Sequence, residues 1–261
     1  MDLFLLTLAG LAAGLVAGLV GLAGGIVIVP ALTWIYGPDA LHSAIVISWF
    51  SVLFNSFSAA AKQWRLRTAP QRLELFHSAR WYLAGAVAVA PAMAMLASTQ
   101  TGLISCAVVA VLQLCLAAVM LWPVEDAPRP RSHVPARDAS FGGIVAAVST
   151  VIGVGGGTYT IAYFVYGAGA RFRDAIATAN VTGFALGALS VAGYLAGVLL
   201  QGTPSPHGLG PISALGMAAV VVSGVIAAPL GVRMAQKLQT RVLRHILIAA
   251  LVISAIRLLF S

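Results

Sequence analysis

The residues of this sequence best suited to bind a ligand are two glycine clusters, at 21–25 and 153–157. Each cluster lies within an apolar run, and glycine in a helix interior costs about 1 kcal/mol relative to alanine. We therefore interpret each cluster as a break in a helix. A helix that begins after such a break presents free backbone N–H groups and a partial positive charge, which suit an anion. Close helix packing is the alternative interpretation, because small residues also let helices touch.

Polar side chains near the two clusters would complete such an anion site. Glycine lets the backbone approach a ligand closely, and hydroxyl and amide groups supply further hydrogen bonds. The candidate substrate-binding residues are Gly24, Gly25, Ser51, Asn55, Gly156, Gly157, Thr158, Thr178, Asn180 and Thr182.

Hydrogen bonding between helices is the alternative role for the polar residues of this set. We favour that role for Ser48 and Ser58, which share a helical face with Ser51 and Asn55. We favour a cavity role for Ser51 and for Thr182, which coincide under the internal repeat described below.

The composition places these residues in a membrane. The chain has 261 residues, of which 60% are hydrophobic and 8% are charged, and its mean hydropathy is +0.98. Soluble domains carry about 25% charged residues. The net charge of +8 is spread over short stretches between apolar runs, which is typical of cytoplasmic loops and gives no reason to expect nucleic-acid binding.

The apolar runs predict an all-α polytopic membrane protein. Two long runs, 3–36 and 139–170, are each divided by a glycine cluster, and a proline-rich linker occupies 123–138. The expected single spans are 43–61, 81–97, 102–122, 175–200, 212–232 and 245–260.

The chain contains an internal repeat. A shift of 132 residues superposes the glycines of the first cluster on those of the second, and a shift of 131 superposes Ser51 on Thr182. We therefore divide the protein into a first membrane repeat, 1–122, and a second, 139–261.

Charge placement predicts that the two repeats have opposite orientations. The basic loops 62–80 and 233–244 should be cytoplasmic, and the uncharged turns 98–101 and 201–211 should be outside. Each repeat is then a glycine-broken helical hairpin plus three transmembrane helices, and both termini lie outside. Inverted repeats with interrupted helices are the usual architecture of secondary transporters, which bind substrate at the breaks.

Ionisable groups are sparse in the expected spans. We assign Glu74, Glu125, Asp126 and Asp138 to loops, and Asp2, Asp39 and Asp174 to span edges, so no buried carboxylate is available for a proton relay. No nucleophile, metal-binding or ATP-binding motif is found. We therefore expect neither an enzyme nor a bound cofactor or metal. Arg171 and Arg173 either determine topology or draw an anion to the cytoplasmic mouth.

The pattern Gly-x-x-Gly-Gly at 21–25, followed by Ile-Val-Ile-Val-Pro at 26–30, resembles the TauE/SafE permeases, as does the second copy at 153–157. The Ala-x-x-x-Ser/Ala stretches that begin at Ala44 and Ala175 are also similar to that family. The resemblance covers nearly the whole chain. It implies transport of sulfite or of organosulfonates such as sulfoacetate, mostly by export.

The first repeat departs from the family pattern at two positions. Ala23 replaces one glycine, and Ile47 stands where a threonine is common, whereas Thr178 keeps that threonine in the second repeat. The first half of the site is therefore less polar than the second.

We interpret the protein as a secondary transporter, in the export direction, of a small sulfur-containing oxyanion. It would work in the lipid bilayer of a bacterial-type plasma (inner) membrane, with the anion held at broken-helix ends near the bilayer midplane. An anion channel on the same architecture is the alternative. A membrane-embedded enzyme or assembly factor is a third hypothesis, which the absence of an acid, base or metal set in the spans disfavours.

Overall fold

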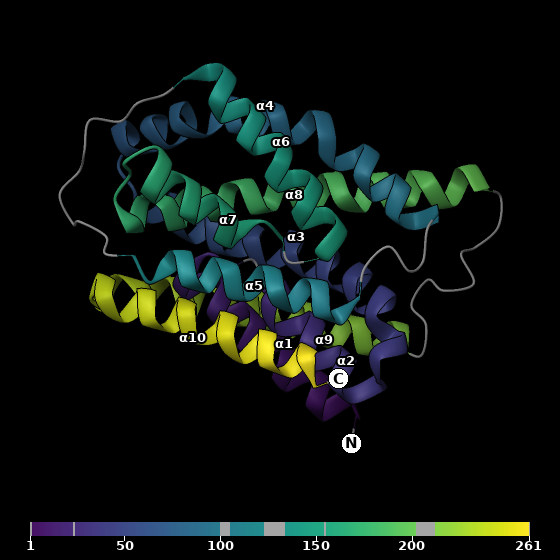
Figure 1. Cartoon of the computed structure of the whole chain (residues 1–261). Coiled ribbons are helices and arrows are strands. Elements are labelled where there is room, and N and C mark those ends of the chain that lie inside the picture. The colour runs from purple at the N-terminus through teal and green to yellow at the C-terminus, as the bar shows by residue number, and fades with distance from the viewer. Residues whose placement is uncertain are drawn as a thin grey trace.

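The computed structural model is built from helices, and no strand occurs in the part of the chain that it describes (Figure 1). That part comprises residues 2–22, 24–99, 105–122, 134–153, 155–201 and 212–260. The helices of the first half are α1 (Asp2–Val20), α2 (Gly25–Tyr36), α3 (Leu41–Leu66), α4 (Ala69–Thr99) and α5 (Cys106–Met120). Those of the second half are α6 (Pro135–Ile152), α7 (Gly157–Ala162), α8 (Phe172–Gln201), α9 (Ala214–Lys237) and α10 (Thr240–Leu259).

Six of the described helical segments are long and apolar enough to cross a bilayer. They are Leu3–Val20, Pro38–Leu66, Ala69–Ala97, Phe172–Leu200, Ala214–Lys237 and Thr240–Leu259. Two shorter apolar helices, Gly25–Tyr36 and Cys106–Met120, accompany them. The chain is therefore an integral membrane protein.

The helices are longer than the expected spans, and this corrects the prediction of a basic loop over 62–80. Lys62 and Arg65 lie in the last turns of α3, and Arg72 and Arg80 lie in α4. Only residues 67 and 68 separate the two helices. Hydropathy marks the apolar stretch, whereas backbone hydrogen bonding continues the helix into the polar layer. Likewise, residues 135–138 of the expected linker begin α6. Residues 123–133 of the expected linker, and residues 100–101 and 202–211 of the expected turns, lie outside the described residues.

Each glycine cluster interrupts a helix, as the sequence predicts. The first hairpin consists of α1 and α2, and the second consists of α6, α7 and the π-helical segment Tyr163–Gly167. Gly21 and Gly24 at the first break, and Gly153, Gly155 and Gly156 at the second, have φ angles between +67° and +84°. Glycine adopts this left-handed conformation without steric cost, which explains why these breaks need glycine.

Each hairpin packs on a helix of the other half of the chain. Helix α1 lies along α9, and α6 lies along α4, while α3 and α8 pack on each other (Figure 1). A Cβ atom built on Gly10, Gly14 or Gly18 of α1 would overlap the backbone of α9. The stripe of glycines spaced by four thus serves the close helix packing that the sequence predicts.

Candidate functional site

The two helix breaks touch each other. A Cβ atom built on Gly157, the first residue of α7, would overlap the carbonyl oxygen of Gly21 and would lie 3.3 Å from the carbonyl carbon of Leu22. The ends of both hairpins are therefore in direct backbone contact. The two glycine clusters, far apart in the sequence, therefore meet where Gly157 lies against Gly21.

The neighbours of the two breaks are reciprocal. A Cβ atom on Gly21 would lie 3.0 Å from the carbonyl oxygen of Ile176 in α8, and a Cβ atom on Gly153 would lie 3.0 Å from Cα of Ile45 in α3. Ile45 and Ile176 coincide under the 131-residue shift. Each break thus packs on the same position of the other half.

The first break opens onto the side chain of Asn55. Gly24 precedes the first turn of α2, whose earliest N–H groups have no partner within the helix. A Cβ atom on Gly24 would lie 3.0 Å from Nδ2 of Asn55, and one on Gly224 of α9 would lie 2.5 Å from Oδ1. The amide of Asn55 is therefore enclosed between two glycines, of which the sequence analysis identified only Gly24. The sequence offers only a weak indication of Gly224. It is one of the small residues of α9, like Gly231, which also packs on α1.

The second break presents Gly156, Gly157 and Thr158 at the start of α7. Gly156 has φ +67°, and a Cβ atom there would lie 2.9 Å from Cδ1 of Leu186 and 3.1 Å from Oγ of Ser149. Thr158, whose side chain is fully buried, follows immediately. Thr158 is thus the next residue after Gly157, which makes the contact between the hairpins.

Four of the predicted site residues carry buried polar atoms that have no hydrogen-bond partner among the described residues. They are Ser51, Asn55, Thr158 and Asn180, and each side chain has 0% exposure. An unpaired buried polar group costs about 1–3 kcal/mol, so native proteins rarely leave such groups without a role. Asn55 lies against Gly24 at the first break, and Thr158 lies in the first turn of α7 at the second break. Unpaired buried groups at these places are typical of a polar binding site. Ser56 and Gln113 share the property on α3 and α5, although the sequence analysis did not place them in the site.

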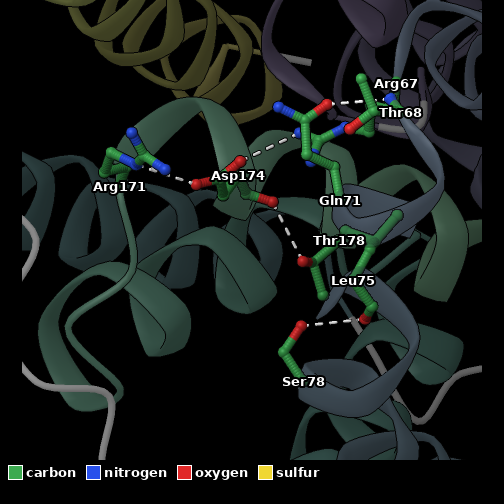
Figure 2. A network of polar contacts seen from close by, with 8 residues as sticks. All are labelled: Arg67, Thr68, Gln71, Leu75, Ser78, Arg171, Asp174 and Thr178. Atoms are coloured by element: carbon green, nitrogen blue, oxygen red, sulfur yellow. Dashed lines mark hydrogen bonds and ion pairs between the residues drawn. The ribbon is translucent and has the colours of Figure 1, made fainter. Parts of the chain in front are cut away.

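The threonines of α8 behave differently. The hydroxyl of Thr178 donates to the carbonyl oxygen of Asp174 over 3.0 Å (Figure 2), and that of Thr182 donates to the carbonyl oxygen of Thr178 over 3.0 Å. Both side chains are buried, but their protons are used within their own helix. Both threonines stay predictions of site residues. Their hydroxyl groups must rotate before they can donate a hydrogen bond to a ligand.

Ser48 and Ser58 bind other helices, as predicted. Ser48 Oγ donates to the carbonyl oxygen of Gly153, and Ser58 Oγ donates to that of Val225 over 3.0 Å. The Ser48 bond holds α3 on the second break. These hydroxyls therefore contribute to the frame around the unpaired groups.

Asp138 corrects the assignment of the carboxylates to loops. It lies in the first turn of α6, is 1% exposed, and accepts a hydrogen bond from the hydroxyl of Tyr163. The prolines and charged residues that precede Asp138 predict that it belongs to the linker. The helix starts at Pro135, a favoured first position for proline, and therefore carries Asp138 into the packed interior. Glu74 likewise lies in a helix, α4.

Comparison with known proteins identifies the family. No curated protein and no solved structure matches the chain significantly. The family model described as sulfite exporter TauE/SafE matches residues 6–258, which is nearly the whole chain and includes both helix breaks. The chain therefore belongs to the TauE/SafE family of membrane sulfite exporters.

Proposed function

We propose that this protein is a secondary transporter that exports a small sulfur-containing oxyanion, such as sulfite or an organosulfonate, and holds the anion at the two helix breaks. The observation that carries the proposal is the set of buried, unpaired polar groups of Ser51, Asn55, Thr158 and Asn180. Two helix breaks accompany them, and at these breaks the start of α7 touches the backbone that follows the end of α1. The family supplies the class of substrate.

Helix starts and neutral donors suit an anion that must leave the site again. The N–H groups at the starts of α2 and α7 have no partner within the helix, and the helix dipole adds a partial positive charge. The amides of Asn55 and Asn180 and the hydroxyls of Ser51 and Thr158 each provide N–H or O–H donors. A buried lysine or arginine would be costly in a membrane without a bound anion, whereas these neutral groups are tolerated in the empty state.

We also propose that residues 1–122 and 139–261 form two inverted repeats. The reciprocal contacts support this: α1 packs on α9 as α6 packs on α4, and each break packs on the matching isoleucine of the other half. Transporters of this architecture expose a central site alternately to the two sides by moving one part against the other. In the inner membrane of a bacterium, such a movement would carry the anion outward.

Counterflow in proteoliposomes tests the proposal. Vesicles loaded with unlabelled sulfite should transiently accumulate labelled sulfite from outside, because a carrier exchanges substrate across one site. Inside-out membrane vesicles should take up the same anion, as expected of an exporter. A flux that shows no counterflow and does not saturate would identify an anion channel instead.

Both termini are expected to lie outside the cytoplasm. The reason is the gathering of the basic segments at one end of the molecule, where Arg67, Arg171 and Arg173 line one cavity together with residues of α9 and α10. Helix α1 begins and α10 ends at the other end (Figure 1). There Arg257 lies over the ring of Trp34, at 5.1 Å from its centroid, which gives this one basic residue an interfacial partner.

A reporter that is active only in the cytoplasm should therefore stay silent when it is fused after Ser261. The same reporter fused within 123–133 should be active. Strong activity of the fusion after Ser261 would contradict the orientation and, with it, the inverted repeats.

A further inference from the structure

A second site with anion-binding chemistry lies at the basic end of the molecule. A cavity of about 610 Å³ opens there between the α3–α4 turn, the start of α8 and the end of α9. Its lining includes Arg67, Arg171, Arg173 and a single carboxylate, Asp174, so two positive charges are in excess among the lining residues. We refer to it as the basic cavity.

The basic cavity borders the first helix break. Ile176 lines the cavity, and its carbonyl oxygen would lie 3.0 Å from a Cβ atom on Gly21. Along α8, Asp174, Thr178 and Thr182 follow at intervals of four residues and are linked by hydroxyl-to-carbonyl hydrogen bonds. The backbone of α8 at Ile176 would thus lie between an anion in this cavity and the first helix break.

Asp174 forms ion pairs with two of the three arginines that line the basic cavity. Its Oδ1 lies 3.1 Å from Nη2 of Arg67, and its Oδ2 lies 3.2 Å from Nε of Arg171 (Figure 2). The third, Arg173, donates to the carbonyl oxygens of Gln236 and Leu238, at 3.1 and 2.7 Å, and thereby closes the end of α9. Arg173 therefore has a structural role, whereas Arg67 and Arg171 converge on a carboxylate that the chain itself supplies.

We propose that the basic cavity is a first binding station for the transported oxyanion, in which the anion competes with Asp174 for Arg67 and Arg171. Each guanidinium gives one nitrogen to Asp174, although its planar fork is suited to two parallel hydrogen bonds with an oxyanion. The side chain of Arg171 is 61% exposed, so an incoming anion reaches its remaining donors first. The proposal of this station depends on the proposed function for one point only, which is the identity of the anion.

Displacement of Asp174 has a mechanical consequence. The Arg67–Asp174 pair joins the end of α3 to the first turn of α8, and these elements belong to different halves of the chain. An anion that takes Arg67 from Asp174 therefore removes an ion pair between the halves at this end. Binding at the basic cavity is thereby coupled to the freedom of the two halves to move.

The test measures sulfite binding by calorimetry to the purified protein in an Asn55→Leu background, which removes a donor of the deeper site. Adding Asp174→Asn frees both arginines and should tighten sulfite binding about fivefold. This factor corresponds to about 1 kcal/mol, the contribution of a partly exposed ion pair that the anion no longer has to break. Adding Arg67→Gln with Arg171→Gln should weaken binding at least about tenfold, because hydrogen bonds to charged groups are lost.

Matched controls separate the site from general surface charge. Glu74→Gln changes the charge as Asp174→Asn does, and Arg65→Gln with Arg233→Gln matches the double arginine variant. All three control positions are exposed and do not line the basic cavity. Each control should shift the affinity by less than about twofold, since screened surface charges contribute little.

The proposal is overturned if Asp174→Asn and Glu74→Gln act alike, if the two arginine pairs act alike, or if no variant binds sulfite. None of these results depends on transport. Conversely, wild-type protein that fails to show sulfite counterflow would contradict the proposed function, while the binding comparison would still decide the basic cavity.

Discussion

Replacing Asn55 with leucine is expected to raise the thermal stability of the protein and to reduce transport by about tenfold or more. The amide of Asn55 is fully buried, and neither its nitrogen nor its oxygen has a partner among the described residues. Leucine has a similar branched shape without those polar atoms, so it should remove a penalty of about 1–3 kcal/mol. If the amide binds the anion, stability and function must change in opposite directions. Thermal unfolding and sulfite counterflow measure the two quantities.

Ser58→Ala is the matched control, one turn further along α3. Its hydroxyl donates to the Val225 carbonyl and thus joins two helices. Its loss should lower the free energy of unfolding by about 0.6 kcal/mol and leave transport near the wild-type rate. An Asn55→Leu protein that transports sulfite like the wild type would remove Asn55 from the site.

Gly157→Ala is expected to abolish transport, because one added methyl group pushes the two hairpin ends apart. That methyl would overlap the carbonyl oxygen of Gly21, a backbone atom that no side-chain rotation can move. Overpacking of this kind costs about 1–3 kcal/mol, so the protein should still insert into the membrane with a lowered Tm. Counterflow and thermal unfolding of the purified variant give the two readouts.

Gly143→Ala provides the comparison within the same hairpin. Its Cβ atom would meet Cγ2 of Val89 at 3.3 Å, and a side-chain methyl group can yield. Transport should persist in this variant. Normal transport by Gly157→Ala would show that transport does not need the close approach between Gly157 and the Gly21 carbonyl.

The helix breaks were predictable because their cause is local. Glycine is the residue that adopts positive φ without steric cost, so two clusters of it in apolar runs mark where the helices stop. The grouping of Ser51 and Asn55 was predictable for a similar reason, since helical spacing places them on one face. The contact of Asn55 with Gly24 at the first break was not predictable from spacing, because it depends on how α3 packs against the first hairpin.

Features that depend on tertiary contacts were missed or misjudged. Asp138 looked like a linker residue because its sequence neighbours are polar, yet Tyr163, twenty-five positions later, stabilises it in the interior. The enclosure of Asn55 by Gly224 likewise joins residues far apart in the chain. The bonds of the Thr178 and Thr182 hydroxyls within α8 are by contrast local, since helical threonines commonly bond the carbonyl four residues earlier, and both threonines stay site predictions.

The packing of α1 along α9 also determines when the protein can assemble during its biosynthesis. Synthesis at roughly 5–20 residues per second separates the completion of Val20 from that of Lys237 by about 10–40 s. Throughout that time, the glycine stripe of the first hairpin has no α9 backbone to contact. The nascent chain must therefore hold a broken, incompletely packed hairpin in the membrane until its last helices are inserted. Retention by the insertion machinery is expected to be longest for this hairpin.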